Sequence, residues 1–256
     1  MVAWKKNFVV VWFSQFLSIM GFSFAMPFAP FFMQELGVTD PAKLKMWVAL
    51  FAAASPVTLA ILAPVWGLLA DRYGRRIMLL RANFAAAVVL ALMGTVHSVA
   101  TLVGLRLLQG VFTGTVAAAQ TMVSVQAPPH RRGFTLGALS AAVYSGGMTG
   151  AFVGGIFADW FGYRAAFYAA GALLFSAGLL VLLGTSETFI RPTELAPMES
   201  QPERVPRDAR TVVLPILLVI TAIAFVRTFD GAFLPLLAQE IHGSISGASI
   251  WTGMLN

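Results

Sequence analysis

The 256-residue sequence contains no cysteine, and charged residues make up only 11% of it. The absence of cysteine excludes a disulfide framework and any metal site with thiolate ligands. The three histidines, His97, His130 and His242, fall in separate predicted loops without metal-ligand spacing. No G-x-x-x-x-G-K-[ST] motif occurs, which argues against direct coupling to ATP. We therefore expect no enzyme activity, no cofactor and no metal.

What the sequence has in excess is apolar surface. Hydrophobic residues make up 58% of the chain, and the charged share is less than half of the roughly 25% that is usual in soluble domains. A soluble core cannot hide so much apolar surface, so the bilayer is the expected solvent. The net charge of +6 sits in clusters between apolar runs, which argues against a nucleic-acid partner.

Seven apolar runs are long enough to cross a bilayer, at roughly 20 residues each. The first contains Gly21 and Pro27 and is too long for a cleaved signal, so it reads as an anchor that stays. The predicted spans are 8–33, 46–70, 77–96, 102–125, 134–158, 165–184 and 211–238.

Lysine and arginine predict the orientation of these spans. With a cytoplasmic N-terminus, twelve basic residues fall on the inner side and three on the outer side, and such a positive-inside bias is typical of multi-pass proteins. We expect a protein of the plasma (inner) membrane with its N-terminus and central linker in the cytoplasm. The outer residues are Lys43, Lys45 and Arg164; the inner ones are Lys5, Lys6, Arg72, Arg75, Arg76, Arg81, Arg131, Arg132, Arg191, Arg204, Arg207 and Arg210.

A ten-residue charged turn, residues 67–76, joins the second and third spans. Glycine permits the tight backbone turn, a carboxylate can pair with the neighbouring cations, and arginines suit anionic headgroups. Its pattern, G-x-x-x-D-[RK]-x-G-[RK]-[RK], resembles the signature of the major facilitator superfamily of transporters. The resemblance implies that Asp71 and Arg75 latch one conformational state. The residues of the pattern are Gly67, Asp71, Arg72, Gly74, Arg75 and Arg76.

The frame of this turn recurs 88 residues later, at residues 155–164. The first copy joins spans two and three, and the second joins spans five and six. Three spans separate the copies, so we expect them on opposite faces of the membrane. That arrangement is what two inverted three-helix repeats produce, and such repeats are known in this superfamily.

Two further stretches carry the resemblance. Arg106, Gln109 and Gly110 match an R-x-x-Q-G pattern of the fourth helix, where the resemblance implies that the arginine serves in proton transfer or gating. The alternative is an arginine that snorkels to the headgroups. Gly110 and Gly114 also predict a small-residue packing face.

Glycines of the fifth span resemble an antiporter signature of the superfamily, with Ala151 in place of its proline. Without that proline we expect a less kinked helix. The glycines imply close approach and pivoting of a neighbouring helix, although plain helix packing is the alternative. They are Gly137, Gly146, Gly150, Gly154 and Gly155.

Span seven contains Arg227 and Asp230, which share one helical face. An intramembrane carboxylate is a candidate proton carrier, and mutual neutralisation of the pair is the alternative. Side chains of spans one and five suggest a cavity for bulky lipophilic compounds, or ordinary helix packing. These candidates for substrate contact are Gln15, Phe22, Met26, Tyr144 and Met148.

Between spans six and seven, residues 187–210 are rich in proline and mixed charge, as in a linker. We therefore expect an all-α membrane protein with three parts. Residues 1–186 form a six-helix N-terminal bundle of two inverted three-helix repeats, and 187–210 form a cytoplasmic linker. Residues 211–256 contain helix seven and the start of helix eight. A twelve-span transporter needs about 400 residues, so we expect a truncated chain.

These observations predict a transporter of the multidrug-exporter branch that exchanges protons for a lipophilic small molecule by alternating access. Two alternatives stay open. One is a sugar or metabolite transporter of the same fold, and the other is a non-transporting membrane fragment or interaction partner. Substrate identity, the direction of coupling and the oligomeric state are not predicted.

Overall fold

The structure, a computed structural model, describes residues 2–186 and residue 236. Its described helices include six that are long and apolar enough to cross a membrane. This confirms an all-helical, multi-pass membrane protein. The linker at 187–210, and nearly all of span seven and the start of helix eight, lie outside the described residues. The six spans are Trp4–Glu35, Pro41–Tyr73, Arg75–Thr95, Val99–Gln126, Pro129–Phe161 and Tyr163–Gly184.

Three of the six spans, the first, fourth and fifth, are built from more than one helical element. The helical elements are α1 (Val2–Ala25), η1 (Met26–Phe28), α2 (Ala29–Glu35), α3 (Pro41–Tyr73), α4 (Arg75–Thr95), α5 (Val99–Phe112), α6 (Thr115–Gln126), η2 (Pro129–Arg131), α7 (Arg132–Phe161) and α8 (Tyr163–Gly184). The first span changes to a 3-10 turn at Pro27, since proline has no N–H for the α-helical ladder.

The fourth span breaks at Gly114, where α5 gives way to α6. Gly114 has a φ of 125°, a backbone conformation that residues with a Cβ rarely adopt. The prediction that Gly114 continues a packed face with Gly110 is therefore wrong, because Gly114 turns the chain and a Cβ there would meet no neighbour. By contrast, α7 runs without a break for 30 residues through Ala151, as expected from the missing proline.

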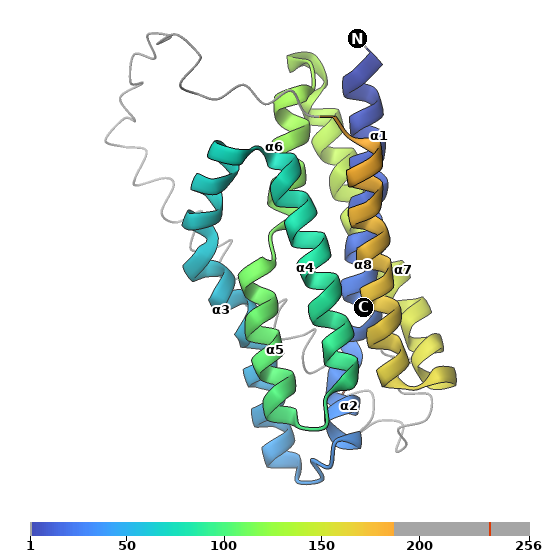
Figure 1. Cartoon of the computed structure of the whole chain (residues 1–256). Coiled ribbons are helices and arrows are strands. Elements are labelled where there is room, and N and C mark those ends of the chain that lie inside the picture. Colours follow the sequence, from blue (N-terminus) through green and yellow to red (C-terminus); the bar gives the residue numbers. More distant parts are fainter. Residues whose placement is uncertain (1, 187–235, 237–256) are drawn as a thin grey trace, which may run out of the picture.

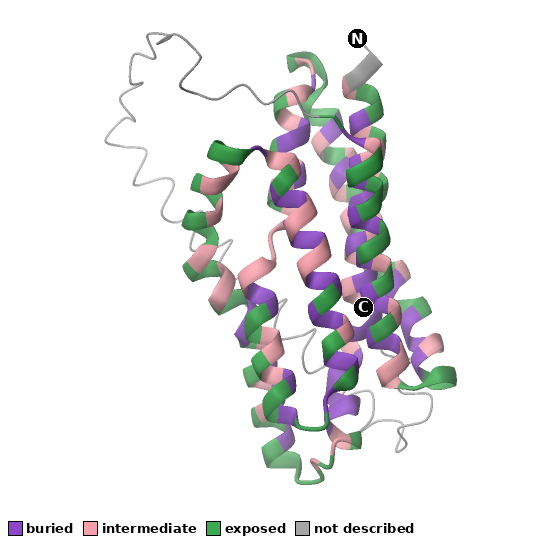
Figure 2. Ribbon diagram, viewed as in Figure 1, coloured by how far each residue is buried: buried purple, intermediate pink, exposed green. Residues whose placement is uncertain are grey.

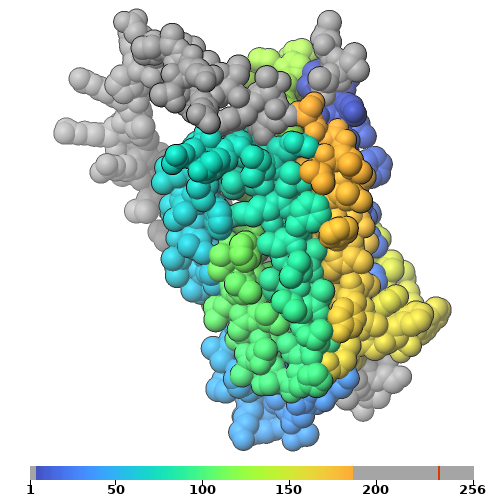
Figure 3. Space-filling model, in the orientation of Figure 1, coloured from blue at the N-terminus to red at the C-terminus, as the bar shows by residue number. Residues whose placement is uncertain are grey.

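Helices α1, α4, α7 and α8 form the packed part of the bundle, with α1 against α7 and α8, and α4 against α8. Buried side chains concentrate along these contacts, whereas the second half of α3 is mostly exposed (Figure 2). Val57, Ile61 and Leu68 are among its exposed apolar residues. Exposed apolar side chains suit a helix that faces lipid or another part of a membrane protein. In the space-filling view α4 lies flush against α8, while α3 stands further out on the other side (Figure 3).

The two turns of the repeated frame have the same geometry at opposite ends of the bundle. Gly74 lies between α3 and α4 with φ 92° and ψ 159°, and Gly162 lies between α7 and α8 with φ 84° and ψ 161°. The first turn lies at the end that also holds the N-terminus, and the second at the far end (Figure 1). The predicted inverted relation of the two three-helix repeats is thereby confirmed for these turns.

Candidate functional site

A cavity of about 560 Å³ opens beside the break between α5 and α6. We call it the Arg106 cavity. Its walls come from α1, η1, α3, α5 and α6, so the first and second three-helix repeats both contribute. Apolar side chains and neutral polar ones alternate around a single cation. The lining residues include Ile19, Phe22, Ser23, Met26, Ser55, Leu59, Arg106, Gln109, Thr113, Thr115 and Gln120.

Arg106 lies midway along α5, and it is fixed there by its neighbours. Its Nη1 donates hydrogen bonds to Gln109 Oε1 and to Met26 Sδ, and its guanidinium lies 4.9 Å from the ring centroid of Phe51. Its Nε is buried and has no hydrogen-bond partner among the described residues. The spacing of Arg106 and Gln109 places both on one face of α5. Because Arg106 itself lines the cavity, its guanidinium can contact whatever enters the cavity.

The close approach of α5 to α3 explains why the R-x-x-Q-G pattern has a glycine at position 110. A Cβ at Gly110 would lie 2.5 Å from the carbonyl oxygen of Ser55, so only glycine fits. Gln15 supports the cavity from α1, because its Nε2 donates 2.9 Å to the carbonyl of Thr115 at the start of α6. Gln15 is fully buried and lies behind the cavity wall.

Three glycines of α7 form the contact with α1. A Cβ on Gly146, Gly150 or Gly154 would collide with the backbone carbonyl of Phe16, Met20 or Phe24, respectively. The predicted close helix approach therefore occurs at these three positions. Gly155 is also buried, whereas a Cβ at Gly137 would meet nothing within 4 Å. Gly137 thus stands apart from this contact.

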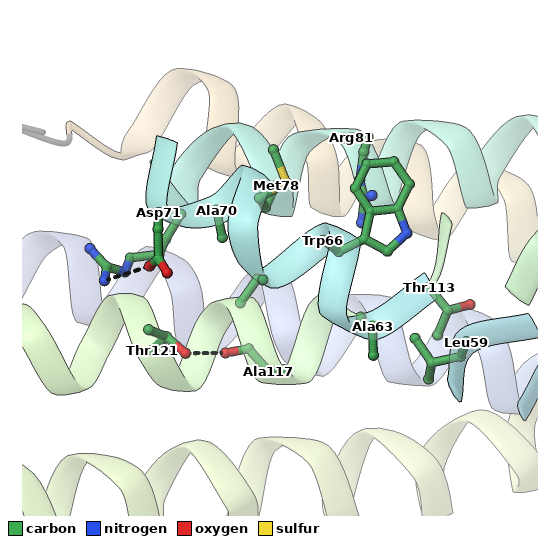
Figure 4. A pocket seen from close by; sticks show the side chains of 14 residues that line it. Leu59, Ala63, Trp66, Ala70, Asp71, Met78, Arg81, Thr113, Ala117 and Thr121 are labelled. Carbon is green, nitrogen blue, oxygen red and sulfur yellow. Dashed lines mark hydrogen bonds and ion pairs between the residues drawn. The ribbon is translucent and has the colours of Figure 1, made fainter. Parts of the chain in front are cut away.

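In the charged turn, Arg75 Nη2 lies 3.7 Å from Asp71 Oδ1, one helical turn away (Figure 4). The Asp71 side chain is 66% exposed, so solvent screens the pair. Arg72 is exposed and lies over the ring of Tyr73. Arg76 points inward instead: its Nη2 donates 2.7 Å to the carbonyl of Leu182 and its Nε donates 3.1 Å to Thr185 Oγ1.

A second cavity, of about 250 Å³, lies between α3, α4 and α6 and adjoins the first at Gly114, which lines both. We call it the Trp66 cavity, after the ring that forms part of its wall (Figure 4). Gly67 and Asp71 also line it. Sequence reasoning missed this site because it counted Arg81 among the loop cations, whereas the structure places Arg81 inside α4. The available signal was an arginine within the predicted span 77–96.

The residues predicted to contact substrate are divided between the cavity and the exposed surface. Phe22 and Met26 line the Arg106 cavity, but Tyr144 and Met148 do not, and their side chains are exposed on α7. Their role in substrate contact stays a prediction. Arg227 and Asp230 lie outside the described residues. Groups of three or more His, Cys, Asp or Glu that could hold a metal are absent from the described part.

The comparisons with known protein families and with known relatives agree on one family. The model of the Major Facilitator Superfamily matches residues 11–255. The multidrug resistance protein MdtG of Proteus mirabilis is 34% identical over 256 residues, covering 99% of this chain. MdtG of Salmonella paratyphi A is 35% identical over 257 residues, again covering 99% of this chain. The chain spans 63% of the length of these curated relatives.

The crystal structure of the human organic anion transporter MFSD10 (TETRAN) superposes with a TM-score of 0.64 at 20% identity. The match covers 73% of this chain and 49% of that one, and at this identity it supports the fold alone. The family model, by contrast, extends over nearly the whole chain and includes the charged turn and both repeats. The chain therefore belongs to the major facilitator superfamily.

Proposed function

We propose that this chain takes part in proton-driven export of lipophilic small molecules across the inner membrane by alternating access. Residues 1–186 form one bundle of the transporter, 187–210 form a cytoplasmic linker, and 211–256 belong to a second bundle. The N-terminus and the linker lie in the cytoplasm. The relatives' name, multidrug resistance protein, supports the export of drug-like compounds.

The Arg106 cavity is the observation that carries the proposal. Its volume of about 560 Å³ lies within the range of about 300–1,000 Å³ that is typical of small-molecule sites. Phe22 and Met26 offer a deformable apolar surface, and thioether and aromatic side chains adapt to varied ligands. Gln109 and the threonines supply polar contacts that orient a ligand without demanding one chemical structure.

Arg106 and Gln109 form the proposed coupling pair. A cation inside the membrane is costly unless a partner or a polar cavity receives it, so its presence marks a functional position. The Gln109 amide oxygen accepts from Arg106, which fixes the guanidinium toward the cavity. In the proposal Asp230 carries the proton, and the Arg106 charge makes proton binding and substrate binding depend on each other.

The glycine contact of α1 with α7 and the charged turn at residues 67–76 supply the proposed motion. Helices that touch through backbone atoms can rotate against each other without crossing side-chain barriers. Asp71 and Arg75 would then latch one state at the cytoplasmic end, since a screened ion pair is weak enough to open.

Flux measurements in liposomes test this function. The 256-residue chain is reconstituted around a pH-sensitive dye, a proton gradient is imposed, and ethidium is added as a lipophilic substrate. We expect ethidium-dependent proton flux that Arg106→Gln abolishes. Lys45→Gln removes an exposed cation at the other end of the bundle and should leave the flux unchanged.

The same measurement separates the alternatives. Accumulation of a radiolabelled sugar without ethidium-dependent flux would favour a sugar or metabolite transporter. The absence of any solute or proton flux, with a folded helical chain, would contradict transport by this chain and leave a non-transporting membrane partner.

A further inference from the structure

Arg81 is held in the second turn of α4 by an aromatic ring. Its guanidinium carbon lies 3.4 Å from the ring centroid of Trp66, which is a close cation–π contact. Trp66 is itself anchored, because its Nε1 donates 2.7 Å to the carbonyl of Val111 near the end of α5. Trp66 of α3 thus positions the cation of α4 and is itself held by α5; Figure 4 shows the Trp66–Arg81 pair.

Two donors of this guanidinium have no acceptor. Arg81 Nε and Nη1 are buried and make no hydrogen bond to any described residue. Stacking on an aromatic ring uses the face of the guanidinium and leaves its in-plane N–H groups unused. Buried donors of a charged group are rarely left unmet, least of all within a membrane span. An acceptor from outside the described part of the chain is therefore expected here.

The Trp66 cavity supplies the space for such an acceptor. Small residues make up much of its wall, among them Ala63, Gly67, Ala70, Ala117 and Ala118. Its charged lining groups are Arg75, Arg81 and Asp71, and Asp71 pairs with Arg75. Arg81 is therefore the cation that lacks a carboxylate partner among the described residues.

The polar neutral groups of the wall do not compete for Arg81. Thr121 Oγ1 donates 2.8 Å to the carbonyl of Ala117, and Thr113 Oγ1 donates 2.9 Å to that of Gln109. Both hydroxyls are turned to carbonyls of their own turns rather than to a guanidinium. The cavity thus combines room and an excess of positive charge with a lining arginine, Arg81, two of whose donors are buried and unmet among the described residues.

We propose that the Trp66 cavity binds an oxyanion of the phosphate type, with Arg81 as its main contact and Trp66 as the platform that holds Arg81. The site adjoins the Arg106 cavity at the α5–α6 break, where both are lined by Leu59, Thr113, Gly114 and Ala117, but Arg81 and Trp66 line only the Trp66 cavity. The shared chemistry is a phosphate group, which reaches the cavity either on a lipid headgroup or as a free small anion.

Trp66 makes the site directly observable by fluorescence. The full chain is placed in dodecyl maltoside micelles, which carry no phosphate group, and titrated with inorganic phosphate, and in parallel with phosphatidylglycerol added to the micelles. The emission of a Trp66→Phe variant is subtracted to isolate Trp66. We expect a saturable change in Trp66 emission with phosphatidylglycerol, with inorganic phosphate, or with both. A response to the lipid alone identifies a headgroup site, and a response to both identifies a general phosphate site.

Arg81 variants decide the assignment. Arg81→Gln should weaken the response by at least about tenfold, since the charge-assisted hydrogen bonds are lost. Arg81→Lys keeps the charge and should retain part of the response even if Arg81→Gln folds poorly. Arg72→Gln removes an exposed cation at the same end of the bundle and should leave the response within about twofold. The proposal is overturned if neither probe changes Trp66 emission, or if folded Arg81→Gln responds as the unmodified chain does.

Discussion

Arg76 and Arg164 clamp opposite ends of the same helix pair. Arg76, at the start of α4, donates 2.7 Å to the carbonyl of Leu182 at the end of α8. Arg164, at the start of α8, donates 3.1 Å to the carbonyl of Gly94 at the end of α4. Both donors and both acceptors are offset by 88 positions, the spacing of the repeated turn. The inverted repeat therefore extends from the backbone turns to individual hydrogen bonds.

Removal of either clamp should loosen the contact of α4 with α8. Each of Arg76→Gln and Arg164→Gln is expected to lower the free energy of unfolding by about 1–2 kcal/mol, since a charged donor is lost from the helix-end carbonyl. The double variant should show the sum, because the two sites are far apart. Thermal unfolding in detergent measures this effect. Arg72→Gln is the exposed control, and an equal loss in that variant would contradict the assignment.

The glycine contact between α1 and α7 predicts that two glycine-to-alanine substitutions on α7 change the free energy of unfolding in opposite directions. Gly150→Ala should destabilise the chain by about 1–3 kcal/mol, because the new Cβ would collide with the backbone of Met20. Gly137→Ala meets no neighbour on the same helix and should stabilise by about 0.5–1 kcal/mol through helix propensity. Denaturant unfolding of the two variants in one detergent is the measurement. A Gly150→Ala variant as stable as Gly137→Ala would show that α7 does not press on α1 at Gly150.

The break in the fourth span predicts different effects on stability for two glycine-to-alanine substitutions in that span. Gly114→Ala should cost about 1–3 kcal/mol, since alanine is strained at a φ of 125°. Gly104→Ala, within α5 and facing open space, should be neutral or stabilising. Circular dichroism during heating compares the two variants. If Gly114→Ala is tolerated as well as Gly104→Ala, then the two helices are continuous in the membrane.

The ion pair of the charged turn should matter more for transport than for folding. Asp71→Asn is expected to change the free energy of unfolding by less than about 1 kcal/mol, because the pair is exposed. Under the proposed function it should nevertheless slow ethidium flux in liposomes, since one state loses its latch. Asp159→Asn alters the matching position of the second repeat, also exposed, and serves as control. Normal flux in Asp71→Asn would remove Asp71 from the gating residues.

The absence of cysteine permits a direct test of topology. Tyr73→Cys and Phe161→Cys place single thiols at matching, exposed positions of the two turns. In intact cells a membrane-impermeant maleimide should label only Phe161→Cys, because the proposed orientation puts the basic turn inside. Labelling of both after permeabilisation is the control. Labelling of both thiols in intact cells would contradict the inverted arrangement.

The sequence alone was sufficient for the number of described spans, the tight turns at Gly74 and Gly162, and the inverted order of the repeats. These features depend on local chemistry: a bilayer requires apolar helices of a given length, and a reversal between two of them favours glycine. The same local logic predicted an unbroken α7, because it depends only on the presence or absence of proline.

Tertiary structure alone decided which polar groups meet. The sequence does not distinguish Gly114, which breaks a span, from Gly110, which packs against Ser55, because both lie at helical spacing in one apolar run. Nor does it distinguish Arg81 on Trp66 from Arg76 on Leu182, since each arginine finds its contact on a helix distant in the chain. Such contacts depend on how whole helices pack. The packing determines which carbonyls, aromatic rings or cavities lie next to a cation inside a span, and these neighbours determine its role.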